Sequence, residues 1–378
     1  MNKLTREELI RYSRHLVLEN FGLESQQKLK NARVLVVGAG GLGCPALLYL
    51  AAAGVGTIGV VDFDVIQESN LQRQILFSFA DIGKSKAEVA GQKLIAQNPY
   101  IAVNIYPEKL TRINCLEIVK KYDIILDGSD NFPTRYLVND ACVLADKVLV
   151  YGSILQYEGQ VSVFNSPSGK TRSSNYRDLF PEPPAPNEVP NCEQAGVLGV
   201  LPGIIGSLMA TETIKIITNI GDALVNRLLI LDLITLETTQ IKIPNRNSRN
   251  SIADLIDYDS FCGVNVPEIS LQKMKEITVK ELKAALDSKE DIQLIDVREI
   301  HENELSNIGG KHIPMAEVPM NTDKIETDKK VVVYCRSGAR SGNIINWLEK
   351  NKNLTNLYNL KGGMLAWRNE IDSSVNVA

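Results

Sequence analysis

A glycine-rich turn follows an apolar run in the segment Val34-Leu35-Val36-Val37-Gly38-Ala39-Gly40-Gly41-Leu42-Gly43. The run before Gly38 predicts a buried strand, and the residues after the turn predict a helix. At such a junction the backbone amides of the helix N-terminus can face a phosphate group. The motif alone is weak evidence for a nucleotide site, because a glycine turn can also be purely structural.

An acidic residue follows at the spacing that a nucleotide site needs. Asp62 lies nineteen residues after Gly43, at the end of the next apolar run. A carboxylate at this place can accept hydrogen bonds from ribose hydroxyls. The two features together favour a nucleotide-binding domain. They leave a nicotinamide-dependent dehydrogenase open as an alternative.

Short apolar runs alternate with helical stretches along the first two thirds of the chain. The runs at 34–37, 58–62 and 124–127 alternate with stretches such as 84–96, which is typical of a parallel α/β sheet. We therefore predict a doubly wound, Rossmann-like α/β fold for the first domain.

Length, charge and cysteine content narrow the class of protein. With 378 residues, the chain is long enough for two or three domains. A net charge of -4 and 6% aromatic residues argue against a nucleic-acid binder. Six scattered cysteines and no signal-like N-terminus predict the reducing cytoplasm. Glycine and proline interrupt the weakly charged stretches 34–61 and 196–217, so we expect no membrane span.

The chain divides by composition into two domains and a linker. We expect an ATP-binding domain at 1–262, a linker at 263–276 and a smaller α/β domain at 277–378. Within the first, residues 165–192 hold six of the fifteen prolines and predict one long loop. Near the N-terminus, the capping box Thr5-Arg6-Glu7-Glu8 predicts a helix that runs from Arg6 towards Leu16.

Cations and polar residues suggest the chemistry of the nucleotide site. Ser69-Asn70-Leu71-Gln72-Arg73 and Lys86 follow Asp62, and Gly128-Ser129-Asp130-Asn131 lies at the carboxyl end of a strand. Hydride transfer does not need such cations. Joining a carboxylate to the α-phosphate of ATP does, and each cation at about 4 Å offers roughly 4 kcal/mol. Asp130 suits Mg²⁺. Solvated surface charges remain the plain alternative.

The motifs of the first domain together resemble the ThiF/MoeB/HesA family. The molybdopterin-synthase adenylyltransferase type is the most similar, and it is related to the E1 enzymes for ubiquitin-like proteins. The matching segments cover nearly the whole domain: Arg11-Tyr12-Ser13-Arg14, 34–44, Asp62-Phe63-Asp64, Ser69-Asn70-Leu71-Gln72-Arg73-Gln74, Asp130-Asn131-Phe132-Pro133-Thr134-Arg135-Tyr136 and Cys192-Glu193-Gln194-Ala195-Gly196-Val197-Leu198-Gly199.

This resemblance implies roles for individual residues. Contacts to ATP and magnesium are implied for Gly41, Asp62, Asn70, Arg73, Lys86 and Asp130. The same motifs add Gly38, Gly40, Gly43, Asp64, Ser69, Leu71, Gln72 and Asn131 to the expected cofactor-binding set. Arg14 is expected to reach the partner subunit's site, which implies a homodimer. Arg14, Arg73 and Lys86 are the expected charge-neutralising residues of catalysis.

One departure from the family concerns zinc. Many members bind structural zinc through two Cys-x-x-Cys pairs, but this chain has Asn175-Tyr176-Arg177-Asp178 and Cys262-Gly263-Val264-Asn265 at these places. A lone thiolate cannot assemble a tetrahedral zinc site. We therefore expect no zinc, and Cys262 as a buried residue.

The second domain carries a cysteine loop. Cys335-Arg336-Ser337-Gly338-Ala339-Arg340 lies between a predicted strand and a helix, and this position with flanking arginines favours a nucleophilic thiolate. The loop resembles that of rhodaneses, as do Asp296-Val297-Arg298-Glu299 and Gly362-Gly363-Met364-Leu365-Ala366-Trp367. A rhodanese cysteine carries a persulfide. Cysteine phosphatases have five residues between Cys and Arg, whereas four occur here. A purely structural domain is the remaining alternative.

The other cysteines are expected to differ in role. Cys192 ends the proline-rich segment and matches the family's second cysteine, which forms a thioester or resolves a disulfide with the carrier. Its polar neighbours favour a functional role over burial. Cys44, Cys115 and Cys142 lie in apolar helical contexts and are expected in the core.

These features lead to one functional hypothesis. The enzyme adenylates the C-terminus of a small ubiquitin-like sulfur carrier that ends in Gly-Gly, and a persulfide on Cys335 then forms a thiocarboxylate. The sulfur donor would be a persulfide or thiosulfate. Alternatives are a dehydrogenase, a scaffold that binds a ubiquitin-like partner without chemistry, and an enzyme of protein conjugation. The pathway (molybdopterin, thiamine, cysteine or tRNA thiolation) stays open.

Overall fold

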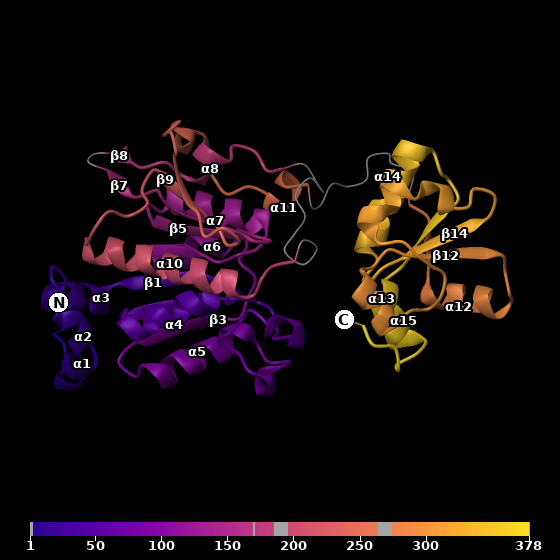
Figure 1. The fold of residues 1–378 in the computed structure, drawn as a ribbon. Helices are drawn as coiled ribbons and strands as arrows, with labels where there is room; N and C mark the ends of the chain where they lie inside the picture. Colours follow the sequence, from indigo (N-terminus) through magenta and orange to yellow (C-terminus); the bar gives the residue numbers. More distant parts are fainter. Residues whose placement is uncertain (1–2, 169–170, 185–195, 264–273, 378) are drawn as a thin grey trace. The chain divides into compact units, whose positions relative to one another are not determined.

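The computed structural model describes residues 3–168, 171–184, 196–263 and 274–377. The chain divides into two compact units, Met1–Asn265 and Val266–Ala378 (Figure 1). Much of the expected linker, residues 264–273, lies outside the described residues.

The larger unit is built on an eight-stranded sheet in the order β10-β9-β6-β5-β4-β1-β2-β3. Neighbouring strands from β3 through β5 are parallel, whereas β6, β9 and β10 extend the sheet as antiparallel strands. The strands are β1 Arg33–Val37, β2 Thr57–Val61, β3 Ala102–Tyr106, β4 Ile124–Asp127, β5 Val148–Leu155, β6 Glu158–Phe164, β9 Arg227–Asp232 and β10 Thr238–Lys242. The predicted doubly wound α/β fold is confirmed, with an antiparallel extension that the apolar runs did not indicate.

Helices cover both faces of this sheet, because its central strands are apolar on both sides. In β1, Val34 and Val36 pack into one core cluster, while Leu35 and Val37 pack into the other. The first face is covered by α3 Gly22–Asn31, α4 Gly43–Ala53, α5 Lys86–Gln97 and α10 Val200–Thr218. The second face is covered by α6 Cys115–Lys120, α7 Phe132–Leu144, α8 Tyr176–Leu179 and α11 Tyr258–Phe261 (Figure 1).

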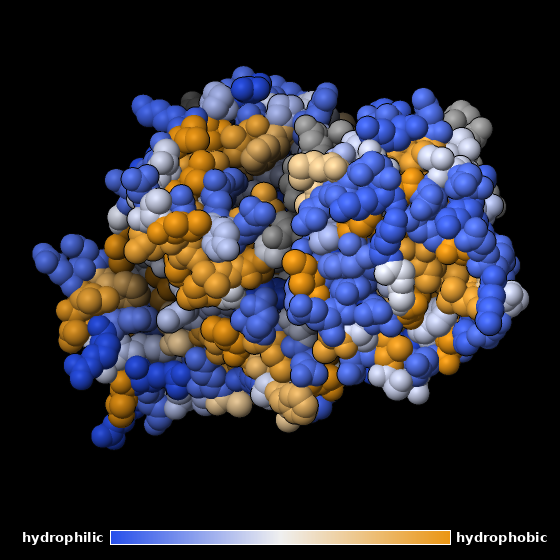
Figure 2. All heavy atoms as spheres, turned by 45° about the vertical axis from the view of Figure 1, so that its right-hand side comes forward, coloured by the Kyte–Doolittle hydropathy of each residue, from blue (hydrophilic) through white to orange (hydrophobic). Residues whose placement is uncertain are grey.

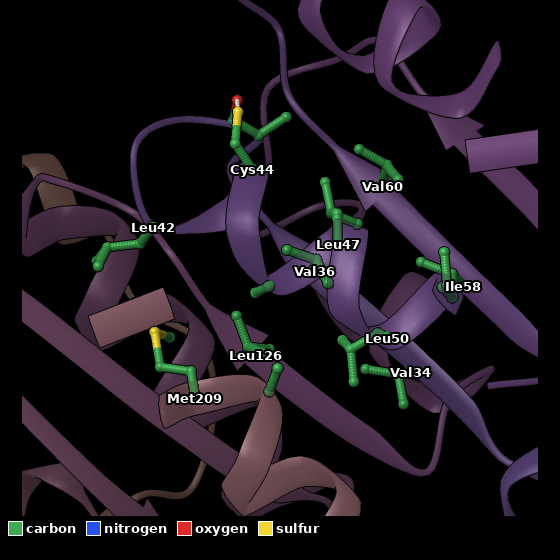
Figure 3. Close-up of a cluster of buried hydrophobic side chains, with 14 of the residues drawn as sticks. Val34, Val36, Leu42, Cys44, Leu47, Leu50, Ile58, Val60, Leu126 and Met209 are labelled. Carbon is green, nitrogen blue, oxygen red and sulfur yellow. Dashed lines mark hydrogen bonds between the residues drawn. The ribbon is translucent and has the colours of Figure 1, made fainter. Parts of the chain in front are cut away.

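Figure 3 shows the first core at close range. Leu47 and Leu50 of α4 meet strand side chains such as Val36 and Leu126, and Met209 of α10 lies beside them. All of these side chains are fully buried. Burial of each leucine stabilises the fold by roughly 1.5–3 kcal/mol. This core fixes α4 against β1, and therefore fixes the turn between them.

The helix α10 is long and apolar enough to cross a bilayer by length and composition. It instead packs against α4, β5 and β6, and buries Leu201, Ile205 and Met209 in the core. Its apolar character is explained by this position over the sheet.

The N-terminal helix is broken, which differs from the single helix expected from Arg6 towards Leu16. The capping box at Thr5 is present, but α1 ends at Arg11 and α2 covers only Ser13–Leu16. Tyr12 lies between them with φ -94° and ψ 13°. Its buried hydroxyl accepts a hydrogen bond from Asn98 Nδ2 at 2.9 Å. We attribute the break to this distant contact, which no local pattern could indicate.

The prediction of one long loop at 165–192 is wrong in its described part. A hairpin of β7 Pro167–Ser168 and β8 Thr171–Arg172 begins it, and α8 follows. Polar side chains cap this backbone: Ser173 Oγ accepts from Ser166 N at 2.9 Å, and Asn175 caps α8. The polar composition therefore reflects side chains that bind backbone groups in a packed segment. Residues 185–192 lie outside the described residues.

The smaller unit is a five-stranded parallel sheet in the order β11-β15-β14-β12-β13. Its strands are β11 Glu276–Ile277, β12 Ile292–Asp296, β13 Lys311–His312, β14 Lys330–Tyr334 and β15 Leu357–Leu360. Its helices are α12 Val279–Asp287, α13 Ile300–Leu305, α14 Ala339–Lys352 and α15 Gly363–Glu370. In β14, alternate residues pack into two different clusters, so this unit also has a core on each face. The strand β11 begins one residue inside the expected linker.

Apolar side chains also reach the surface. Figure 2 shows them in several groups among hydrophilic residues on the face that it draws. On α1, α2 and the residues that follow, Ile10, Val17 and Leu18 are 67%, 77% and 54% exposed. These three lie close in sequence to Arg14, which is itself exposed on α2.

Candidate active sites

A cavity of about 320 Å³ opens at the carboxyl ends of β1, β2 and β4. Its walls come from the turns that follow these three strands, and from the segment 70–74 and the start of α5. The carboxyl edge of a parallel sheet is where α/β proteins bind ligands. The structure thus brings together sequence motifs that lie up to about 160 residues apart in the chain, from Val37 to Val197.

The glycine turn after β1 is shaped by two close backbone approaches. Gly38 has φ +88°, and a Cβ there would lie 3.0 Å from Gly128 O. A Cβ on Gly43 would lie 1.9 Å from Gly38 O, so only glycine fits at the start of α4. Gly38, Gly40 and Gly41 line the cavity, whereas Gly43 shapes the turn without lining it.

Asp62 is buried at the end of β2 and organises the turn. Its Oδ2 accepts a hydrogen bond from Ala39 N at 2.8 Å, and its Oδ1 accepts one from Asp64 N at 2.8 Å. Burial raises the pKa of Asp62, and these backbone hydrogen bonds oppose that shift. Each carboxylate oxygen retains a further lone pair, which can accept a ribose hydroxyl.

Lys86 supplies a buried cation at the cavity wall. It is 6% exposed at the first residue of α5, and its Nζ lies 2.9 Å from Asp64 Oδ2. The Asp64 side chain is 49% exposed, so the partner of this lysine can exchange with solvent or ligand. An anion in the cavity would therefore meet a lysine that the fold already holds in place.

Arg73 and Asn70 line the cavity from the segment after β2. Arg73 is half-buried, and its Nη1 donates to Ser69 O at 3.1 Å. Asn70 is buried and its Oδ1 accepts from Gln67 N at 3.0 Å, which caps a short 3₁₀ turn at Glu68–Asn70. The other expected residues of this motif, Ser69, Leu71 and Gln72, do not line the cavity.

Asp130 and Asn131 line the cavity after β4. Asn131 caps α7 through a 2.9 Å hydrogen bond from Thr134 N, which directs the chain from strand to helix. Asp130 is exposed and its Oδ1 accepts a hydrogen bond from Asn131 Nδ2 at 3.4 Å. Its carboxylate fits a magnesium ion that takes its other ligands from phosphates and water. No group of three or more His, Cys, Asp or Glu residues that could hold a metal occurs within the described ranges.

Two residues of the cavity, Gln74 and Ser129, belong to the sequence motifs but were not among the expected site residues. Gln74 Oε1 and Ser129 Oγ are buried, and the described part of the chain offers neither of them a hydrogen-bond partner. Both residues line the cavity. Because an unpaired buried polar atom is costly, these two atoms indicate that a polar ligand completes the site. Their burial could not be read from the sequence.

Two expected site residues do not join this cavity. Arg14 lies on α2 and is not among the residues that line it. Cys192 lies outside the described residues.

The second candidate site is the turn between β14 and α14. Cys335 is 1% exposed, and its Sγ accepts hydrogen bonds from Gly338 N at 3.2 Å and from Ser341 Oγ at 3.3 Å. Met364 N donates to Cys335 O at 2.9 Å, so the start of α15 supports the loop. A Cβ on Gly363 would lie 2.3 Å from Cys335 O, which explains the glycine there.

The two arginines of this loop differ in their environment. Both Nη atoms of Arg340 donate to the Glu302 carboxylate at 2.6 Å. Burial alone would raise the pKa of Glu302, but hydrogen bonds from Arg340 and Glu299 N bring it below its ordinary value. Arg336 carries a buried Nε for which no partner occurs within the described residues. Both arginines flank the loop as the sequence indicates, but Arg340 is paired with Glu302 and so offers less positive charge to Cys335 than its position alone suggests.

The place of the family's zinc site holds an ion pair. Arg177 Nε and Nη2 donate to Asp140 at 2.8 and 2.7 Å, and Tyr258 Oη donates to the same carboxylate at 2.7 Å. Arg177 also lies over the rings of Tyr136 and Phe261. Cys262 is buried nearby, and burial raises its pKa to about 11. The groups at the family's zinc positions are the guanidinium of Arg177, the amide of Asn175 and the neutral thiol of Cys262. This set does not fit a tetrahedral zinc ion.

The three remaining cysteines confirm the expected core positions. Cys44, Cys115 and Cys142 are fully buried. Burial raises the pKa of Cys44 and of Cys115 to about 12, and it raises that of Cys142 as well. Figure 3 shows Cys44 beside the α4 core, where its Sγ donates to Ala39 O at 3.3 Å.

Comparison with known families identifies both units. The model of the ThiF family matches residues 12–252, and that of the rhodanese-like domain matches residues 278–370. The chain belongs to the ThiF family. The larger unit matches the ThiF model, and we call it the ThiF unit. The smaller unit is a rhodanese-like domain, and we call it the rhodanese unit.

Relatives that span nearly the whole chain carry both activities in their names. The chain is 46% identical to the probable adenylyltransferase/sulfurtransferase MoeZ of Mycobacterium tuberculosis, over 97% of this chain and 95% of that protein. It is 39% identical to the adenylyltransferase and sulfurtransferase MOCS3 of Drosophila grimshawi, over 98% and 86%. The sulfur carrier protein adenylyltransferase of Thermus thermophilus is 49% identical, over 69% and 98%. The chain is thus an adenylyltransferase and a sulfurtransferase.

Solved structures agree with the fold of the larger unit. The E. coli MccB structure with ATP has a TM-score of 0.52 and 25% identity, over 62% of this chain and 72% of that chain. The PaaA structure has a TM-score of 0.55 at 22% identity, over 64% and 76%, and supports the fold alone. The ThiF-type fold therefore supports ATP as the nucleotide.

Proposed function

We propose that the ThiF unit adenylates the C-terminal glycine of a small ubiquitin-like sulfur carrier and that the rhodanese unit converts the product to a thiocarboxylate. The observation that carries this proposal is the lining of the cavity at the sheet edge. Two cations, Lys86 and Arg73, line it together with the unpaired polar atoms of Gln74 and Ser129. The name of the Thermus thermophilus relative supports a sulfur carrier as the substrate.

Adenylation joins two anions, and the cavity is built to neutralise them. The carrier carboxylate attacks the α-phosphorus of ATP, the bond to the β-phosphate oxygen breaks, and pyrophosphate leaves with the electron pair. No protein nucleophile is needed. Lys86 and Arg73 are proposed to offset the negative charge, the glycine turn to approach the phosphates, and Asp62 to accept the ribose hydroxyls.

Asp130 is the proposed magnesium ligand, together with phosphate oxygens and water. A bound magnesium ion would neutralise phosphate charge in the cavity. Asn131 caps α7 and so holds the adjoining backbone, while the exposed carboxylate of Asp130 can turn towards the nucleotide.

Apolar residues beside the cavity support a protein substrate. Ile154 and Val197 line the cavity, and Gln156 pairs with Val197 as a β-bridge. Next to them, Tyr157 is 49% exposed and Leu198 is 50% exposed. We propose that the folded part of the carrier docks on this apolar surface while its extended Gly-Gly tail enters the cavity.

Sulfur transfer then uses Cys335. With thiosulfate as the donor, the Cys335 thiolate forms a bond to the outer sulfur, the original S–S bond breaks, and sulfite leaves. The terminal sulfur of the resulting persulfide attacks the acyl-adenylate carbonyl and AMP leaves, which gives an acyl disulfide. A Cys192 thiolate then attacks Cys335 Sγ and releases the thiocarboxylate. The Cys192–Cys335 disulfide so formed needs an external dithiol to be reduced. A transient acyl group on Cys192 is the second proposed role.

We further propose a cytoplasmic homodimer in which Arg14 reaches the partner subunit's nucleotide site. The exposed apolar residues Ile10, Val17 and Leu18 beside Arg14 support an interface at these helices.

The division of labour is tested by two assays on the full chain with a Gly-Gly carrier. We expect Arg73→Ala to abolish carrier-dependent exchange of labelled pyrophosphate into ATP. We expect Cys335→Ala to keep this exchange and to lose thiocarboxylate formation, which mass spectrometry of the carrier detects. Loss of exchange in the cysteine variant would contradict the proposal. An isopeptide-linked product would favour protein conjugation, and carrier binding without ATP consumption would favour a scaffold.

A further inference from the structure

A buried hydrogen-bond chain leads from the sulfur of Cys335 to the side chain of Asn359. Ser341 Oγ lies 3.3 Å from Cys335 Sγ and 2.7 Å from Asn359 Oδ1. Ser341 is fully buried and Asn359 is 5% exposed. The three residues come from the loop after β14, from α14 and from β15. Water therefore has little access to any of these three residues.

The orientation of the Asn359 amide is set by the loop. Its Nδ2 donates to Gly338 O at 3.0 Å. The opposite orientation would place two carbonyl oxygens against each other, so Oδ1 must face Ser341. Asn359 Oδ1 is therefore an acceptor that needs the serine proton.

Ser341 has one hydroxyl proton and three acceptors within reach of it. Asn359 Oδ1 lies 2.7 Å from Ser341 Oγ, Gly338 O lies 3.2 Å away and Cys335 Sγ lies 3.3 Å away. Gly338 O already accepts from Asn359 Nδ2, so it depends less on the serine proton. When Cys335 is a thiol, the S–H can donate to Ser341 Oγ, and the hydroxyl donates to Asn359. When Cys335 is a thiolate, Gly338 N donates to the sulfur at 3.2 Å, and the Ser341 hydroxyl at 3.3 Å can supply a second hydrogen bond. Its rotation towards sulfur leaves Asn359 Oδ1 buried without a donor, which is costly. Asn359 and the thiolate thus compete for the same proton.

We propose that Ser341 and Asn359 form a proton switch that positions and tunes Cys335 for sulfur transfer. The hydroxyl of Ser341 donates to Sγ while negative charge lies on that atom. It returns to Asn359 once a persulfide has formed, because the charge then lies on the terminal sulfur. Ser341 contacts the reacting sulfur, and Asn359 is a positioning residue that acts through it. The proposal rests on the proposed role of Cys335 as the sulfur carrier.

The other charged groups around this loop should have the same effect on Cys335 in every variant of Ser341 and Asn359. Arg340 is paired with Glu302 of α13, and Arg336 lies on the loop itself. Lys275, whose O accepts from Asn359 N, directs its ammonium to Thr355 O. None of these charged side chains bonds to Ser341 or Asn359 in the described part of the chain. Substitution of the two switch residues should therefore leave these charged groups unchanged.

The test measures alkylation of Cys335 by iodoacetamide in the full-length protein, followed by mass spectrometry of the peptide that contains it. We expect Ser341→Ala to slow alkylation at pH 7 roughly tenfold, because a hydrogen bond to a charged group is lost. Ser341→Thr keeps the hydroxyl and should restore the rate at pH 7.

Asn359→Leu has the opposite expected effect, because it removes the nearer of the two oxygens that compete with the sulfur for the serine proton. The farther one, Gly338 O at 3.2 Å, remains. Its alkylation at pH 7 should be as fast as in the unmodified protein or faster. Equal slowing by Ser341→Ala and Asn359→Leu would overturn the switch and indicate loop packing instead, as would an unchanged rate in Ser341→Ala. Tryptophan fluorescence checks that the rhodanese unit of each variant is folded, because Trp347 and Trp367 both lie in that unit. Persulfide loading from thiosulfate, seen as one added sulfur on the Cys335 peptide, is a separate readout: its absence in the unmodified protein would contradict the proposed function and leave the alkylation result valid.

Discussion

Lys86 Nζ lies 2.9 Å from Asp64 Oδ2, and both side chains line the nucleotide cavity. The lysine is buried, but the aspartate is half exposed. A phosphate that enters the cavity can therefore replace Asp64 as the partner of Lys86, while the Asp64 carboxylate becomes solvated. The ion pair holds the cation in place before the nucleotide binds.

Removal of this cation should abolish adenylation without unfolding the protein. We expect Lys86→Met to reduce pyrophosphate exchange by 100-fold or more, since a cation about 4 Å from a phosphate contributes roughly 4 kcal/mol. Lys84→Met is the matched control, because Lys84 lies two residues earlier, does not line the cavity and has a 59% exposed side chain. Comparable losses in both variants would show that the site does not depend on Lys86.

The glycine turn should tolerate no side chain at Gly43. We expect Gly43→Ala to abolish ATP binding, because a Cβ would lie 1.9 Å from Gly38 O. Gly203→Ala in α10 is the control, since a Cβ there meets nothing within 4 Å. Alanine in a helix interior should stabilise that variant by roughly 0.5–1 kcal/mol. Calorimetric ATP titration measures the first effect, and normal binding by Gly43→Ala would refute it.

The Arg177–Asp140 pair should be essential for the stability of the ThiF unit. We expect Arg177→Met to lower the free energy of unfolding by roughly 3–5 kcal/mol, because Asp140 is left as an unpaired buried charge. Lys121→Met, which breaks an exposed pair with Glu117, should cause no measurable change. Residual pyrophosphate exchange after incubation in urea reports on this unit. A zinc-selective chelator, with exchange assayed in excess magnesium, should leave the unmodified protein unaffected. Loss of exchange under these conditions would point to a structural metal.

Glu302 should make the rhodanese unit sensitive to acid. Its pKa is lower in the folded than in the unfolded state, so its stabilising contribution is present above the unfolded pKa of about 4.3 and is lost as pH falls through the folded value. We expect Glu302→Gln to weaken the pH dependence of unfolding below about pH 4.3. Glu304→Gln on the same helix is the exposed control.

Tryptophan fluorescence measures this effect in the full-length chain. Both tryptophans, Trp347 and Trp367, lie in the rhodanese unit, so their signal follows that unit alone. An acid transition that is identical in Glu302→Gln and in the unmodified protein would contradict the prediction.

The sequence predicted the features that depend on local pattern. The apolar runs identified β1, β2, β4 and β14, because strands of a parallel sheet buried on both faces read as continuous apolar segments. The glycine turn, Asp62 and Asp130 were found because they follow strands that end at one sheet edge. Lys86 begins α5 instead, and its role came from the resemblance to the family. The polar segment after Asn165 was misread, since its hydroxyl and amide groups bond to backbone that the composition could not place.

Residue type and spacing were enough to indicate the central strands, the two families and the chemical groups available. Which of these groups lie in contact depends on the tertiary structure. In the folded protein the first helix ends near Tyr12, and Arg340 is paired with Glu302. An ion pair of Arg177 and Asp140 lies at the place of the family's zinc site. Ser341 connects Cys335 to Asn359 by hydrogen bonds. Each of these contacts connects separate elements, and the energy of a buried polar group depends on the partner that the fold brings to it.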